Sequence, residues 1–249
     1  MSSSPANQAR GRRALVTGGS GDIGAAICRA LAATGHFVHV HAHAHADPAQ
    51  TLADQIRGAG GGAQCVTFDL ADAQATHAAL EGVLATGPID VLVHNAGIHD
   101  DAPMAGMTER QWRRVIDVSL HGFFHVAQPL LLPMARARFG RIVCVSSVAA
   151  QLGNRGQTNY AAAKSALHGA AKSLAREMGS RGVTVNVVAP GIIAGRLTAA
   201  AFSAEQVREL VPAGRAGTPE EVAVLVAFLC SAEAAYVNGQ VIGINGGMV

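Results

Sequence analysis

Short apolar runs rich in β-branched residues alternate with longer alanine- and leucine-rich segments along the chain. The runs have the length of strands, and we expect strands at 13–17, 37–40, 64–68, 89–93, 141–145 and 183–188. The segments between them are long enough for crossover helices. Because the runs are continuously apolar, both faces of the sheet should be covered, as is typical of parallel sheets. The pattern predicts an α/β fold of the Rossmann type, a doubly wound parallel sheet of about seven strands with helices on both faces.

No composition shift or repeat marks a boundary between domains. We expect one domain over 11–249, preceded by a disordered segment at 1–10, because 249 residues with 49% hydrophobic content fit one large α/β domain. The glycines at 58–62 should end a helix and turn the chain into the next strand. A further helix is expected at about 108–134, where Pro129 and Pro133 should kink or terminate it.

Composition excludes several classes of function. Only 14% of the residues are charged and the formal net charge is +2, which indicates neither a nucleic-acid-binding surface nor an acidic tail. The first ten residues lack the apolar run of a secretion signal, and no apolar stretch approaches the ~20 residues that span a bilayer. The four cysteines have neither zinc nor disulfide spacing. We therefore expect a cytoplasmic protein without nucleic-acid or membrane partners.

A glycine-rich loop, TGGSGDIG from Thr17 to Gly24, directly follows the first expected strand and leads into a helical segment. Glycine lets the backbone approach a diphosphate closely, and the first turn of a helix offers free N–H groups and the positive end of its dipole. We interpret the loop as a dinucleotide-binding site rather than as a plain turn between a strand and a helix.

A second motif, YAAAK, places Tyr160 and Lys164 four residues apart, on one face of a helix. Ser147 follows the strand expected at 141–145, at the sheet edge where open α/β folds gather their ligand groups. Reducing a ketone requires a proton at its oxygen, which Tyr160 can donate. We expect the ammonium of Lys164 to lower the pKa of Tyr160, and Ser147 to hydrogen-bond the oxygen as negative charge develops there.

These motifs together resemble the short-chain dehydrogenase/reductase family. Thr17, Gly18, Ile23 and Gly24 fit its TGxxxGxG loop, and Ser147, Tyr160 and Lys164 match its catalytic residues. The resemblance implies a nicotinamide cofactor, which Tyr160 and Lys164 also contact. It assigns further cofactor contacts to Ser20, Asp22, Asp69, Leu70, Asn95, Ala96, Gly97, Pro190, Gly191 and Ile193.

Three positions depart from the family pattern. Asp22 replaces the middle glycine of the loop, and its charge should repel a diphosphate unless it turns outward, for example as a helix cap. Ser119 replaces the fourth catalytic residue, an asparagine, and its hydroxyl has a shorter reach and no carbonyl. We hypothesise slower turnover, which a failure of Ser119→Asn to raise kcat would contradict. Gly195 replaces a threonine, which removes one contact along the nicotinamide that the backbone of Ile193 can still supply.

The stretch HVHAHAHAD, which starts at His39, puts a histidine at every second position. Neighbouring histidines of such a strand lie about 7 Å apart and can share a metal ion, but only Asp47 is at hand to complete a ligand set. We favour plain packing for His39 and His41. By resemblance the stretch selects between the two nicotinamide cofactors, and the absence of an acidic residue there favours NADP(H), with His43 or His45 as a phosphate partner. We therefore expect no metal.

Within the family, the resemblance is closest to the bacterial 3-oxoacyl-[acyl-carrier-protein] reductases. It rests on GNRGQTNYAAAKSAL (153–167), SLAREMGSRGVTVNVVAPG (173–191), PAGRAGTPEEVA (212–223) and NGGM (245–248). This implies NADPH-dependent reduction of a 3-oxoacyl thioester on acyl carrier protein, docking of that carrier at Arg138 and Arg181, and a homotetramer. Because of the departures, we also consider a specialised lipid or polyene pathway.

Two alternatives remain open. The chain could be a short-chain dehydrogenase acting on a free small alcohol or ketone, in which case it would be active on such a substrate and inactive on acyl carriers. It could also be a weakly active binding subunit that pairs with a catalytic homologue. In that case Tyr160→Phe would leave its biological role intact.

Overall fold

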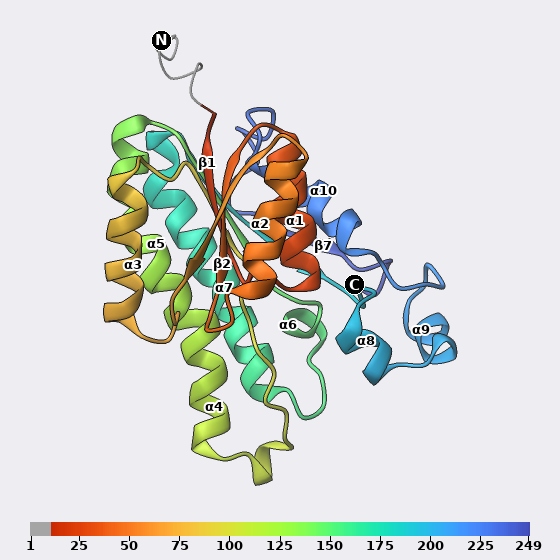
Figure 1. Ribbon diagram of the computed structural model, residues 1–249. Coiled ribbons are helices and arrows are strands. Elements are labelled where there is room, and N and C mark those ends of the chain that lie inside the picture. The colour runs from red at the N-terminus through yellow and green to blue at the C-terminus, as the bar shows by residue number, and fades with distance from the viewer. Residues whose placement is uncertain (1–10) are drawn as a thin grey trace.

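A computed structural model describes residues 11–249, and the segment 1–10, for which disorder is expected, lies outside the described residues. Seven parallel strands form one sheet in the order β3-β2-β1-β4-β5-β6-β7 (Figure 1). They are β1 (Arg13–Thr17), β2 (Phe37–Ala42), β3 (Gly62–Thr67), β4 (Val91–His94), β5 (Gly140–Val145), β6 (Val183–Pro190) and β7 (Val241–Ile244). The sequence order reverses between β1 and β4, which is the switch point where doubly wound sheets bind ligands. The predicted fold class is confirmed.

Helices cover both faces of this sheet (Figure 1). One face carries α1 (Asp22–Ala33), α2 (Asp47–Gly58) and α10 (Pro219–Cys230). The other carries α3 (Ala73–Ala85), α5 (Gly122–Ala137) and α7 (Thr158–Met178). Consecutive residues of a strand point to opposite faces of the sheet. Leu15 packs on the face covered by α3, α5 and α7, whereas Ala14 and Val16 pack on the face covered by α1, α2 and α10. This explains why consecutive positions of β1 are apolar instead of alternating with polar ones.

Shorter elements surround the carboxyl edge of the sheet. They are α4 (Glu109–Ile116), α6 (Ala149–Leu152), α8 (Arg196–Ala201) and α9 (Ala204–Leu210), with single turns at η2 (Met104–Gly106), η3 (Asp117–His121) and η4 (Gly179–Arg181). The glycines at 58–62 end α2 and lead into β3 as predicted. A single domain over 11–249 stays a prediction, which the one sheet running through all seven strands supports.

The helix expected at 108–134 is present in three parts, α4, the π-helical turn η3 and α5. Of the two expectations for Pro129 and Pro133, termination is wrong, because α5 continues to Ala137 and stops where Arg138 adopts a left-handed conformation with φ 52°, and a kink stays a prediction. Leu130 and Met134 are buried in the core and hold this part of the helix in place. By length and composition alone, 109–137 is also the one described stretch that could cross a membrane.

Candidate active site

A cleft of about 1680 Å³ opens along the carboxyl edge of the sheet. Most residues assigned from the sequence line it, namely Gly18, Ser20, Asp22, Ile23, Gly24, His43, Asp69, Leu70, Asn95, Ala96, Gly97, Ser147, Tyr160, Lys164, Pro190, Gly191 and Ile193. Thr17 and Ser119 are buried and do not line it. Arg138 and Arg181 precede β5 and β6, at the opposite edge of the sheet.

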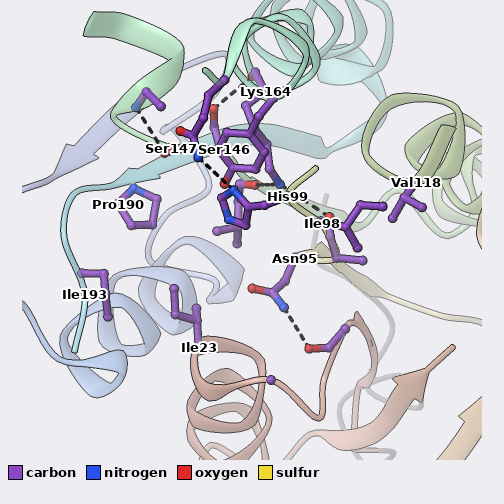
Figure 2. Close-up of a pocket in the computed structure, with 18 of the residues that line it drawn as sticks. Ile23, Asn95, Ile98, His99, Val118, Ser146, Ser147, Lys164, Pro190 and Ile193 are labelled. Carbon is purple, nitrogen blue, oxygen red and sulfur yellow. Dashed lines mark hydrogen bonds between the residues drawn. The ribbon is translucent and has the colours of Figure 1, made fainter. Parts of the chain in front are cut away.

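The glycine-rich loop is held by the end of β4. The Thr17 hydroxyl accepts the backbone N–H groups of Asn95 and Ala96, at 3.0 and 3.1 Å. The Asn95 amide in turn donates to the Gly18 carbonyl at 3.0 Å, as Figure 2 shows. A Cβ at Gly24 would lie 2.1 Å from the same Gly18 oxygen, so only glycine allows this close packing. Thr17 is therefore a buried residue that holds the loop in position, and it does not face the cleft.

Two of the strand histidines are structural, as predicted. His41 accepts the Gly18 N–H at 3.1 Å and contacts the Phe68 carbonyl at 3.0 Å, and burial lowers its pKa to about 4. His39 contacts Arg13 and Gln64. A neutral His41 thus fixes the loop from β2, a role the sequence pattern does not reveal. Within 11–249 no three metal-ligating side chains of His, Cys, Asp or Glu come together.

His43 lies beyond the end of β2, where its side chain is 66% exposed. Its Nδ1 is 3.4 Å from a carboxylate oxygen of Asp69, which follows β3. The two residues that the sequence places at the adenosine end of a cofactor therefore do meet at one end of the cleft.

Ser147, Tyr160 and Lys164 come together above β5. The Lys164 ammonium is buried and donates to the Val145 carbonyl at 2.9 Å, and burial lowers its pKa to about 8. Figure 2 shows Lys164 and Ser147 on the same side of the cleft, with Pro190 close by. Tyr160 is close enough to the Ser147 side chain for Ser147 to lower the pKa of Tyr160. The three residues thus form one group.

The expectation that Lys164 lowers the pKa of Tyr160 is wrong, because the pKa of Tyr160 is raised. Burial raises the pKa of Tyr160, and Ser147 lowers that pKa by less than burial raises it. The Lys164 nitrogen lies 5.9 Å from the centroid of the Tyr160 ring and faces backbone carbonyls. Desolvation is therefore the main influence on the Tyr160 pKa, and the charge of Asp101 raises that pKa further.

Sequence reasoning missed His99, whose ring stacks on that of Tyr160 with centroids 4.2 Å apart. Its Nδ1 receives the Gln157 amide N–H at 3.1 Å, and the same amide donates to Asp101 at 2.8 Å. Because Nδ1 accepts a hydrogen bond, the ring proton of neutral His99 belongs on Nε2. The sequence pointed to His99 and Gln157 only through their positions. His99 lies in the segment IHDD (98–101), which comes after β4, and Gln157 lies three residues before Tyr160.

Ser119 lies in the π-helical turn η3, with a fully buried hydroxyl that has no hydrogen-bond partner. Its carbonyl is 2.9 Å from Nε2 of His94, whose Nδ1 is 3.3 Å from the Thr17 hydroxyl. Since that hydroxyl already accepts two N–H groups, its hydrogen is left for His94, and His94 donates through Nε2 to Ser119. A chain of hydrogen bonds thus joins β1, β4 and η3.

Asp22 is the first residue of α1 and does not cap that helix, whose N-cap is Gly21. Its carboxylate oxygen Oδ2 accepts the backbone N–H of Arg196, the first residue of α8, at 3.2 Å. Asp22 thus satisfies a free N–H at the start of a helix, as the expected helix-capping role requires, but the helix is α8 rather than α1.

Comparison with known proteins agrees with this geometry. A family model described as Enoyl-(Acyl carrier protein) reductase matches residues 19–249. The chain belongs to the short-chain dehydrogenase/reductase family, oxidoreductases that use a nicotinamide cofactor.

Its relatives include proteins named 3-oxoacyl-[acyl-carrier-protein] reductase FabG. The chain is 41% identical over 236 residues to that of Aggregatibacter actinomycetemcomitans, covering 94% of this chain and 98% of the relative. It is 42% identical over 241 residues to that of Escherichia coli K12, covering 96% and 97%. It is 40% identical over 240 residues to that of Staphylococcus aureus Mu50, covering 95% and 98%.

Proposed function

We propose that the protein is an NADPH-dependent reductase that converts a 3-oxoacyl thioester on acyl carrier protein to the 3-hydroxyacyl thioester. The observation that carries this proposal is the convergence of Ser147, Tyr160 and Lys164 at the sheet edge that also holds the glycine-rich loop. The similarity to the FabG proteins supports the choice of substrate.

The residues present fit a dinucleotide. The loop after β1 has no room for a side chain at Gly24, and the first turn of α1 follows it directly. The same cleft is also lined by three further residues that the sequence assigns to the cofactor, namely Asp69, Asn95 and Ile193. When bound, the nicotinamide supplies a hydride to the carbonyl carbon.

The chain's own residues handle the oxygen. Tyr160 donates its hydroxyl proton to the ketone oxygen, and the Ser147 hydroxyl hydrogen-bonds that oxygen as negative charge develops. Lys164, charged below about pH 8, partly offsets the cost that burial places on the tyrosinate that remains, which solvent then reprotonates. His99 keeps the Tyr160 ring in place by stacking. Ser119 contributes no hydrogen bond to this step in the present geometry.

The preference for NADPH rests on the end of β2. Ala42 and His43 stand where a carboxylate would bind the ribose hydroxyls and repel a 2′-phosphate. His43 is exposed and lines the cleft beside Asp69, so its imidazole is within reach of a phosphate bound at this end. His43→Asp should shift the preference toward NADH.

A further part of the proposal is that acyl carrier protein docks at Arg138 and Arg181, and the place of these arginines in the fold supports an oligomer. Arg138 and Arg181 are exposed neighbours, since the Arg138 guanidinium donates to the Ser180 carbonyl at 3.1 Å. They stand at the amino ends of β5 and β6, whereas Ser147 and Tyr160 stand at the carboxyl ends. A carrier docked there would deliver its thioester to the site of another copy, which supports a homotetramer or a pairing with a homologous subunit. We place the enzyme in the cytoplasm.

A second candidate is enoyl thioester reduction, which the description of the matching family model favours. The cleft offers two hydroxyls, those of Tyr160 and Ser147, which suit a reacting carbonyl oxygen rather than a carbon–carbon double bond.

The test is NADPH oxidation with acetoacetyl thioester and with crotonyl thioester, each on acyl carrier protein and on a small thiol. The proposal expects oxidation with the acetoacetyl substrates, slower oxidation with NADH, and none in Tyr160→Phe. Activity only with crotonyl thioester would establish enoyl reduction. Activity only with free small ketones would establish the free-substrate alternative. Binding of NADPH without any turnover would point to the binding subunit.

A further inference from the structure

Two of the positions that depart from the family pattern touch each other. Oδ2 of Asp22 accepts the backbone N–H of Arg196 at 3.2 Å. A Cβ built on Gly195 would lie 2.4 Å from that same oxygen and 3.3 Å from the Asp22 carboxyl carbon. A carboxylate at 22 in this orientation therefore leaves no room for a side chain at 195.

The backbone at Gly195 does not itself call for glycine. Its φ of 165° and ψ of 178° are extended values that any residue adopts. The reason for glycine is therefore the space that the carboxylate occupies. Turning the carboxylate away to admit a side chain would break its hydrogen bond with Arg196.

The contact joins two segments that border the cofactor end of the cleft. Asp22 and Ile23 belong to the glycine-rich loop, whereas Ile193, Gly195 and Thr198 follow β6. All five residues line the cleft. Figure 2 shows Ile23 and Ile193 on neighbouring walls.

The segment 193–198 is already fixed on its other side. The Ala194 N–H donates to the Gly217 carbonyl at 2.7 Å, and Ile193 pairs with Gly217 as an isolated β-bridge. The Asp22 carboxylate supplies the fixation on the side of α1. The segment is thus held from both sides.

We propose that Asp22 and Gly195 are one coupled device, the Asp22–Gly195 clasp, that positions residues 193–198 over the cofactor end of the cleft. Asp22 is a positioning residue and touches no reacting atom. The clasp also directs the carboxylate to an N–H outside the glycine-rich loop, which reduces its repulsion of a diphosphate. The functional part of this inference rests on the proposed cofactor site.

A double-mutant cycle tests the coupling through the Kd for NADPH, measured by fluorescence. Gly195→Thr alone forces the carboxylate out and should raise Kd at least ~10-fold, whereas Asp22→Gly alone loses one hydrogen bond and should raise it about threefold. The double variant, which restores the family's residues at both positions, should return to within about threefold of wild type. Asp22→Asn keeps an acceptor for the Arg196 N–H and removes the negative charge, so it should not raise Kd.

Limited trypsin digestion without cofactor tests the clasp independently of any cofactor chemistry. Arg196 is exposed, and its N–H is held by Asp22. Cleavage after Arg196 should accelerate about fivefold or more in Asp22→Gly but not in Asp22→Asn, while cleavage after Arg208 in α9 stays unchanged. Multiplicative effects in the binding cycle, or unchanged cleavage after Arg196, would overturn the clasp. If NADPH does not bind at all, the digestion alone decides the clasp, and the proposed function fails separately.

Discussion

At the residue scale, the buried Lys164 sets the pH range of the proposed reaction. Burial lowers its pKa to about 8, so the ammonium is present below that pH and is lost as the pH rises through it. Burial raises the pKa of Tyr160, which therefore keeps its proton in this range. We predict that kcat/KM falls above about pH 8 while Tyr160 still carries its proton.

The control for this pH profile is Lys164→Arg, whose guanidinium stays charged throughout. Its residual activity should show no decline between about pH 7 and pH 9.5. A wild-type profile that is flat over the same range would contradict the role assigned to Lys164.

The position of Ser119 predicts that its hydroxyl has no catalytic role. Its hydroxyl is buried without a partner, and such a group destabilises the folded state by ~1–3 kcal/mol. Ser119→Ala should therefore leave Tm unchanged or raise it by ~2–4 °C, with kcat within about threefold of wild type. Calorimetry and steady-state assays measure both. A fall in kcat of more than about tenfold would restore the catalytic role expected from the family pattern.

Sequence predicted the residues that carry local motifs and missed those that depend on distant contacts. Tyr160 and Lys164 share a helix, so their spacing alone placed them together. His99 meets Gln157 only because the loop after β4 folds against the turn before α7, across 58 residues of sequence. No periodicity signals such a contact.

At the element scale, apolar runs located the strands, but pairing decided their ends. β2 extends to Ala42, two residues beyond the apolar run at 37–40, because Ala42 pairs with Thr67 of β3. β7 was not singled out, since its apolar segment equally suited the core or an interface. The π-helical turn between α4 and α5 was also unforeseen, because no residue pattern distinguishes it from a continuous helix.

The hydrogen bonds of His94 that join β1, β4 and η3 yield a stability prediction. His94→Phe keeps an aromatic ring but leaves the Thr17 hydroxyl hydrogen and the Ser119 carbonyl without this partner in the core. We expect the free energy of unfolding to fall by ~2–4 kcal/mol, measured by urea denaturation.

The matched control for this substitution is His94→Gln, which retains a donor and an acceptor and should lose about half as much stability. Equal stability of His94→Phe and wild type would show that these hydrogen bonds do not hold the elements together.

At the scale of the whole molecule, the arginines and the catalytic residues occupy opposite edges of the sheet. β5 has six residues, each rising about 3.3 Å, so the edges lie about 20 Å apart. If acidic carrier protein docks at Arg138 and Arg181, charge reversal at both should raise KM for carrier-bound substrate at least ~10-fold and leave KM for a small thioester unchanged. Added salt should have the same selective effect on wild type.

Arg29→Glu on α1 is the control for this experiment, because Arg29 is exposed and distant in sequence from the arginine pair. Equal increases in KM for both kinds of substrate would show that the two arginines act on the fold rather than on the carrier.

The most direct test of the central claim follows the hydride. Acetoacetyl thioester is incubated with NADPH carrying deuterium at the transferable position, and the product is analysed by mass spectrometry. The account predicts a 3-hydroxyacyl thioester with one deuterium at C3 from wild type and none from Tyr160→Phe. Recovery of unreduced thioester from a wild-type enzyme that binds NADPH, or equal labelling by Tyr160→Phe, would contradict it.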